Sequence, residues 1–164
     1  MSDVFKYFGA LSVIVCAFLI SRSYSLYLKR GVRECECFLS LLQRIEGAIR
    51  CFLSPVGEIF SGFECSEGSV MEFVNDVRSG KTVKDAFSER EATLAVGKEG
   101  KKILSELFSE LGRGYKDGTV ALISAARSEM EKYTLSAGEE EKKNSKLVAA
   151  LLLGGAVGAL LLFL

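Results

Sequence analysis

The chain has 164 residues, no histidine, and 21 basic against 21 acidic side chains, which give a formal net charge of zero. Without histidine, the serine–histidine and cysteine–histidine catalytic arrangements and histidine metal sites are excluded. We expect no cofactor, no small-molecule substrate and no nucleic acid as a partner. The five cysteines are an odd number without C-x-x-C spacing, which indicates reduced thiols and not a disulfide framework.

The first apolar stretch covers residues 4–20, reads VFKYFGALSVIVCAFLI, and contains Lys6 as its one charged residue. This length and composition predict a transmembrane helix, with the Lys6 ammonium reaching the interface from the first turn. A cleaved secretory signal is the alternative. No A-x-A-like cleavage site follows, however, and the sequence turns basic at once.

Residues 22–146 are predicted to form one small helical domain. Its first helix has apolar residues three and four apart on one face, with polar residues on the other. That apolar face consists of Phe38, Leu41, Leu42, Ile45, Ala48, Ile49 and Phe52. Ser54 and Pro55 then predict a break and the start of a new helix.

Two further helix starts carry capping signatures. Ser69 and Glu72 form an S-x-x-E box, and Thr82 and Asp85 form a T-x-x-D start. Gly80 between them predicts the end of the first of these helices. The expected inward-facing residues are Phe73, Val74, Val77, Val83, Ala86 and Phe87.

The rest of the domain continues the helical period. Apolar residues from Ile103 to Leu111 predict a helix that Gly112 and Gly114 terminate, and a last helix runs without interruption from about Gly118 into the final apolar stretch. No segment between the apolar stretches has the period of a strand. The predicted fold class is therefore all-α: a compact helical bundle flanked by N- and C-terminal transmembrane helices.

The final stretch, residues 147–164, contains no charged residue. Eighteen helical residues extend about 27 Å, close to the roughly 30 Å thickness of the hydrocarbon core, so a second transmembrane helix is predicted. The alternative is a buried core helix, which would need a larger protein around it. Within this span Ala150, Gly154 and Gly158 recur every four residues, a spacing that allows close helix packing or merely reflects common membrane-helix composition.

Basic residues flank both predicted spans on the side of the middle segment. They are Arg22, Lys29, Arg30, Arg33, Lys142, Lys143 and Lys146. The positive-inside tendency then places residues 22–146 in the cytoplasm and makes the chain an integral protein of the cell membrane. An anionic-lipid patch is a second interpretation of the same residues.

No phosphate-binding loop of the G-x-x-x-x-G-K-[ST] kind is present, and we do not expect an enzyme.

Four segments carry a resemblance to a known family. They are LLQRIEGAIRCFLSPVGEIF, SGKTVKDAF, LGRGYKDG and the closing EEEKKNSKLVAALLLGGAVGALLLFL. In order and spacing they resemble the stage III sporulation protein AB family, whose members are similar in fold to the cytoplasmic domain of the inner-membrane F protein of type II secretion. The resemblance implies a component of the channel machinery between mother cell and forespore. Its implied partners are the secretion-type ATPase, stage III sporulation protein AA, and other membrane subunits of the channel.

Exposed mixed charge beside a loop suggests where such a partner binds. We expect part of the contact at Lys98, Lys101, Lys102, Arg113, Lys116 and Asp117. A two-span membrane regulator or receptor that recruits a cytoplasmic signalling protein is the alternative function, and a hydrolase acting through carboxylates is a third. The number of copies in the assembly is left open.

Overall fold

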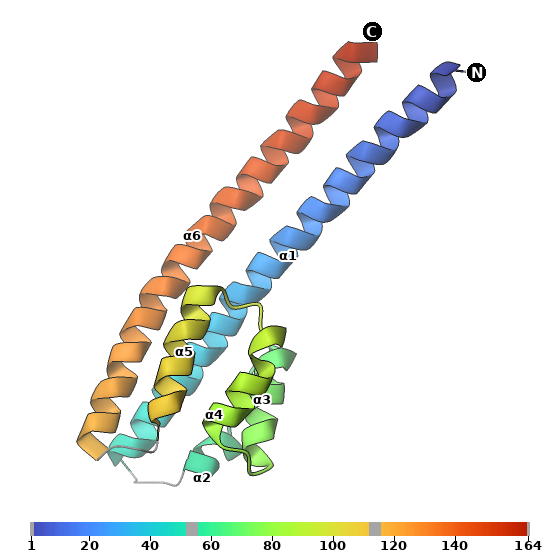
Figure 1. The fold of residues 1–164 in the computed structure, drawn as a ribbon. Coiled ribbons are helices and arrows are strands. Elements are labelled where there is room, and N and C mark those ends of the chain that lie inside the picture. The colour runs from blue at the N-terminus through green and yellow to red at the C-terminus, as the bar shows by residue number, and fades with distance from the viewer. Residues whose placement is uncertain (1, 52–55, 112–115, 164) are drawn as a thin grey trace. The chain divides into compact units, whose positions relative to one another are not determined.

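The computed structural model describes residues 2–51, 56–111 and 116–163. The helices are α1 (Ser2–Cys51), α2 (Val56–Ser61), α3 (Gly68–Arg78), α4 (Val83–Arg90), the 3-10 turn η1 (Glu91–Thr93), α5 (Lys98–Glu110) and α6 (Lys116–Phe163) (Figure 1). Within them, the side chains of residues 2–11, 13, 14, 17, 51, 56, 57, 116, 117, 149, 151–153 and 156–163 lie outside the description. No strand occurs in the described ranges, so the all-α prediction is confirmed.

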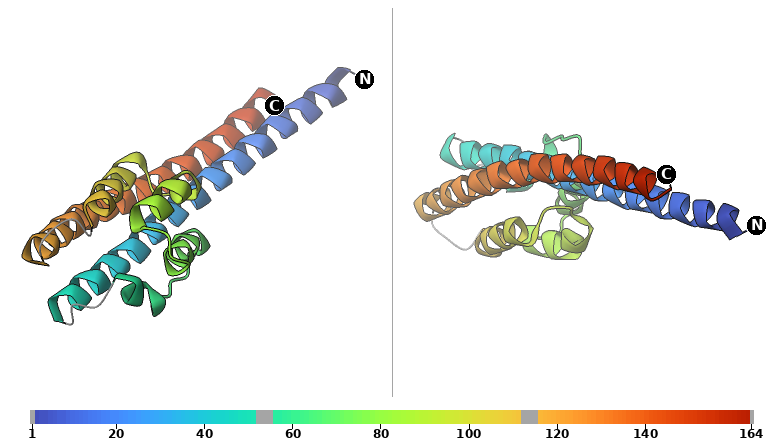
Figure 2. Two further views of the ribbon diagram at one scale, coloured as in Figure 1. Left: turned by 60° about the horizontal axis from the view of Figure 1, so that its bottom comes forward. Right: turned by 90° about the horizontal axis from the view of Figure 1, so that it is seen from above.

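The chain divides into two compact units. One consists of residues Met1–Lys29 and Gly138–Leu164, and the other of Arg30–Ala137, which we call the helical domain. In the first unit the beginning of α1 and the end of α6 lie side by side and run in opposite directions (Figures 1 and 2). The Lys29 ammonium lies 3.8 Å from a Glu141 carboxylate oxygen and joins the two helices there.

The predicted membrane spans, residues 4–20 and 147–164, are helical wherever the structure describes their backbone. Many of their side chains lie outside the described residues. Over the part of the chain that is described, no helix is both long and apolar enough to cross a membrane. The two spans therefore stay predictions, whereas the uninterrupted final helix is confirmed by α6.

Five phenylalanine rings form the centre of the helical domain, one from each of the first five α-helices. Their centroids are 5.1–6.4 Å apart in the pairs that touch, and several pairs meet edge to face. The rings belong to Phe38, Phe60, Phe73, Phe87 and Phe108, and each is at least 98% buried. Aromatic pairs in these arrangements contribute about 0.5–1.5 kcal/mol beyond the burial of their area. The cluster therefore joins α1–α5 around one core, as the helical period predicts.

Interactions within four residues define the turn between α3 and α4. The Thr82 hydroxyl accepts a hydrogen bond from the Asp85 amide at 3.1 Å, which confirms the predicted start of α4. Gly80 has a φ of 101°, a left-handed conformation that favours glycine, and it ends α3 as predicted.

The prediction that Ser69 caps α3 is wrong. The helix begins at Gly68, and its N-cap residue, Glu67, makes no side-chain capping hydrogen bond. The Ser69 hydroxyl instead donates to the buried Glu34 carboxylate at 2.6 Å. The Ser69 hydroxyl therefore binds the distant charged carboxylate of Glu34 and not a nearby backbone group.

Two arginines hold the C-terminal end of the six-residue helix α2. The Arg78 guanidinium donates to the carbonyl oxygens of Phe60, Ser61 and Phe63 at 2.6–3.0 Å. Arg44 donates to the Ile59 carbonyl at 3.0 Å. The last carbonyls of a helix lack intrahelical partners, and the two arginines supply donors to them and to the Phe63 carbonyl beyond the helix. Ser54 and Pro55, the predicted start of this helix, lie outside the described residues.

Candidate partner-binding groove

The carboxylate of Glu34 on α1 holds the loop that leads into α5. It is fully buried and accepts four hydrogen bonds. The donors are the Ala95 and Val96 amides at 2.5 and 3.1 Å, the Ser69 hydroxyl at 2.6 Å and the Arg30 guanidinium at 2.9 Å. A buried carboxylate is tolerated only where such donors replace water. Helix α5 therefore starts at a fixed place relative to α1 and α3.

Glycines on two helices, Gly31 on α1 and Gly100 on α5, allow close approaches at this loop and at the start of α5. A Cβ at Gly31 would lie 2.7 Å from the Ala95 carbonyl oxygen, closer than real Cβ atoms come. A Cβ at Gly100 would lie 2.6 Å from the Tyr133 ring of α6. The Tyr133 hydroxyl in turn accepts a hydrogen bond from the Gly97 amide at 3.0 Å. These contacts place the N-terminal part of α5 directly against α6.

An ion-pair cluster fixes α6 against α1 on the other side. The Glu46 carboxylate, whose side chain is 8% exposed, lies 3.0 Å from Arg127 of α6 and 2.7 Å from Arg50. Buried apolar residues of α6, namely Ile123, Ala126 and Met130, face the same core. The α5–α6 pair is therefore held by both polar and apolar contacts with the rest of the domain.

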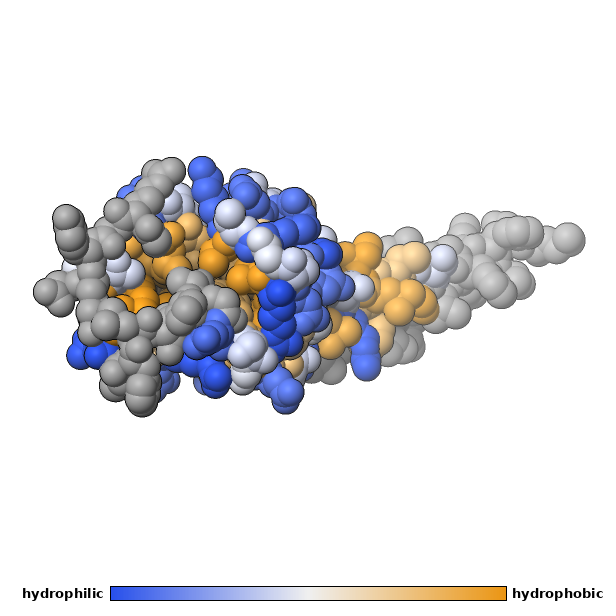
Figure 3. Space-filling model, turned by 90° about the horizontal axis from the view of Figure 1, so that it is seen from below, coloured by the Kyte–Doolittle hydropathy of each residue, from blue (hydrophilic) through white to orange (hydrophobic). Residues whose placement is uncertain are grey.

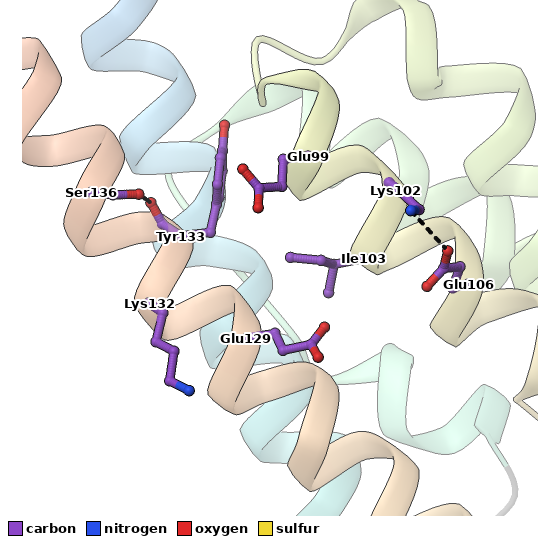
Figure 4. A pocket seen from close by; sticks show the side chains of 8 residues that line it. All are labelled: Glu99, Lys102, Ile103, Glu106, Glu129, Lys132, Tyr133 and Ser136. Atoms are coloured by element: carbon purple, nitrogen blue, oxygen red, sulfur yellow. Dashed lines mark hydrogen bonds and ion pairs between the residues drawn. The ribbon is translucent and has the colours of Figure 1, made fainter.

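A groove of about 530 Å³ lies between α5 and α6. Figure 4 shows Glu99, Ile103 and Glu129 pointing into the space between the two helices, with Tyr133 beside them. Its lining residues are Glu99, Lys102, Ile103, Glu106, Glu129, Lys132, Tyr133 and Ser136. An apolar centre from Ile103 and the Tyr133 ring is therefore rimmed by three carboxylates and two ammonium groups. This is the usual anatomy of a protein–protein contact site.

The space-filling view in Figure 3 shows how this domain mixes the two kinds of surface. On the face seen from below, hydrophobic residues lie beside hydrophilic ones. Of the large hydrophobic residues that are described in the domain, Leu122 and Leu135 are exposed, at 36% and 72%.

The predicted partner residues fall into three groups. Lys102 lines the groove and lies 3.8 Å from Glu106 on the same helix. Lys98 and Lys101 are on α5 but are not lining residues. Arg113 lies outside the described residues, as do the side chains of Lys116 and Asp117 at the start of α6. The predicted contact between these residues and a partner stays a prediction.

The other predicted site is the small-residue line of the final span. Ala150 and Gly154 are exposed on α6, and among the described residues no atom outside the helix's own backbone lies within 4 Å of a Cβ built on Gly154. The side-chain position of Gly158 lies outside the described residues.

The sequence did not indicate the α6 half of the groove. Glu129, Lys132 and Ser136 look like ordinary solvated positions of a long helix. The one signal for their role is the pair of glycines at 97 and 100, which leaves room for an aromatic ring from elsewhere in the chain.

The side chains that line the groove can form ion pairs and hydrogen bonds with a bound molecule, and the Tyr133 ring provides an aromatic face. Among the described residues, no three histidine, cysteine or acidic side chains could together hold a metal ion. Two thiols of the core are held protonated: burial raises the pKa of Cys35 to about 12, and burial with a neighbouring Cys65 thiol does the same for Cys37. These side chains are suited to binding a protein surface.

Taken together, the described elements are all helical, and the domain that they form presents a charged groove between α5 and α6. The model of the family described as Stage III sporulation protein AB matches residues 6–164, nearly the whole chain, and the chain belongs to this family. The resemblance noted in the sequence is thereby confirmed, and membership implies a role in sporulation. No curated protein and no solved structure matches the chain.

Proposed function

We propose that this protein is a non-enzymatic membrane component of the channel machinery between mother cell and forespore. In this role it couples a cytoplasmic secretion-type ATPase, stage III sporulation protein AA, to the membrane complex. Family membership supports the link to sporulation. The two apolar stretches at residues 4–20 and 147–164, with basic residues on their inner flanks, support an integral protein with a cytoplasmic middle segment.

The observation that carries the proposal is the α5–α6 groove. Its five charged residues come from two helices that the core and the Glu34 anchor hold in place. A preformed groove binds a partner without the entropic cost of ordering its own backbone. Alternating charges on the rim select a partner with complementary charges and speed its association. We therefore assign the ATPase contact to this groove.

The test is binding of the ATPase to the full chain held in lipid nanodiscs, measured at low and at high salt. Charge reversal at Lys102 and Lys132 together should weaken binding about tenfold, and the difference should shrink as salt increases. Lys84→Glu with Lys143→Glu is the matched control, since both are exposed helical lysines outside the groove. This control should bind like the unaltered chain.

Unchanged binding by the Lys102/Lys132 double variant would remove the groove from the proposal. No binding of the ATPase by the unaltered chain in nanodiscs would contradict the proposed partner itself. In that case, capture of a kinase or another signalling protein by the same groove would favour the regulator.

A further inference from the structure

The unit formed by the beginning of α1 and the end of α6 contains a second groove of about 360 Å³. Its polar lining residues are Ser21, Arg22, Ser25, Lys29 and Ser145. Arg22 forms no ion pair, and the three serine hydroxyls form no hydrogen bond, with any described residue. Lys29 is partly neutralised by Glu141 at 3.8 Å. One unpaired guanidinium and three unused hydroxyls therefore line the same small space.

The remaining lining residues are apolar: Phe18, Leu26 and Val148. Phe18 and Leu26 are about half exposed, and so is Tyr24 between them. Leu19 and Ile20, within the predicted first span, are also exposed. One side of the groove thus suits a charged group with several acceptor oxygens, and the other suits a hydrocarbon chain.

We infer that this groove binds an anionic phospholipid, with the head-group phosphate at Arg22 and an acyl chain along Phe18 and Val148. A guanidinium matches phosphate oxygens through two parallel hydrogen bonds, and serine hydroxyls supply further donors. Tyrosines such as Tyr24 favour the level of the head groups, where one side of the ring is apolar and the other is wet. This inference rests on the proposed membrane placement.

The polar lining residues also explain why the lipid should be anionic. With Glu141 beside Lys29, the described charges at the groove are two cations and one carboxylate, a net charge of one positive unit. A zwitterionic phosphatidylcholine brings a cation of its own next to Arg22. A phosphatidylglycerol does not, and its glycerol hydroxyls can pair with the serines.

The experiment has two arms, both with the full chain. In the first, the chain is reconstituted into phosphatidylcholine vesicles, and flotation measures its membrane insertion. In the second, the detergent-solubilised chain is titrated with phosphatidylglycerol or phosphatidylcholine of identical acyl chains, and native mass spectrometry counts the bound lipid. Glycerol phosphate serves as the head group without a hydrocarbon chain.

We expect one saturable phosphatidylglycerol per chain, bound about tenfold more tightly than phosphatidylcholine, with no saturable binding of glycerol phosphate. Arg22→Gln with Lys29→Gln should abolish that preference. Lys142→Gln with Lys143→Gln removes the same charge from exposed positions that do not line the groove, and it should preserve the preference.

Equal loss in both double variants would show diffuse charge attraction and overturn the site, as would equal binding of the two lipids. Saturable binding of glycerol phosphate with the same affinity would overturn the role of the acyl chain. A chain that inserts into vesicles but lacks the lipid preference contradicts this inference alone. A chain that does not insert contradicts the membrane placement, and the inference fails with it.

Discussion

Replacing Glu34 by alanine tests whether a buried carboxylate holds the α5–α6 groove in position. The substitution removes the acceptor of the Ala95 and Val96 amides and of the Ser69 hydroxyl. A buried donor left without a partner costs about 1–3 kcal/mol, and breaking a buried charged pair costs about 3–5 kcal/mol. Since the side chain is fully buried and two of its donors are backbone amides, we expect a loss of about 3–5 kcal/mol for the Ala variant.

Glu34→Gln separates the hydrogen bonds from the charge. Its amide oxygen can still accept from Ala95 and Val96, but its NH₂ group faces the Arg30 guanidinium, so we expect a loss of about 1–2 kcal/mol. Urea unfolding of the full chain in detergent micelles, followed by far-ultraviolet circular dichroism, measures both values. Hydrogen exchange at the two loop amides should accelerate most in the alanine variant. A loss below about 1 kcal/mol for alanine, or equal losses for both variants, would refute the anchoring role.

Three further predictions use the same unfolding measurement or simple chemistry. Gly31→Ala should destabilise the protein by about 1–3 kcal/mol, because the new Cβ would lie 2.7 Å from the Ala95 carbonyl oxygen. Gly47→Ala should stabilise it by about 0.5–1 kcal/mol, because no described atom outside the helix's own backbone lies within 4 Å of the new Cβ. A hydrogen bond from Arg90 lowers the pKa of Asp76. The Asp76 carboxylate therefore stabilises the fold above about pH 4, and this contribution is lost as the pH falls through the lowered pKa. Asp76→Asn should reduce the loss of stability in acid. Iodoacetamide at mildly alkaline pH should alkylate the partly exposed Cys65 early and Cys35, with its pKa of about 12, only on unfolding, as mass spectrometry of a time course would show. Equal stability changes at the two glycines, unchanged acid sensitivity, or equal alkylation rates would contradict these predictions.

Local features of this fold were predictable because their causes lie within a few residues. Thr82 and Asp85 are three residues apart, and their capping contact depends on little else. The buried stripes were predictable for a similar reason: residues such as Leu41 and Ile45 share one helix face, and the helical period places them together.

The features that sequence reasoning missed depend on partners far along the chain. Ser69 has a good local capping sequence, but Glu34 lies 35 residues away and offers a charged acceptor in a dry environment. The α6 half of the groove depends on the contact between Tyr133 and Gly97, which are 36 residues apart. Neither pairing leaves a periodic trace in the sequence, so only the folded chain reveals it.

The two arginines that bind the C-terminal end of α2 have a consequence for the order in which the chain folds. Six residues are too few to nucleate a helix in water, where isolated helices shorter than about 12–15 residues are marginal. The carbonyls at its C-terminal end find their donors on α1, through Arg44, and on α3, through Arg78. Helix α2 can therefore become stable only once α1 and α3 have come together. The packing of its Phe60 ring against Phe73 is accordingly a late step of folding. Substitutions in α2 should accelerate unfolding and leave the rate of folding nearly unchanged.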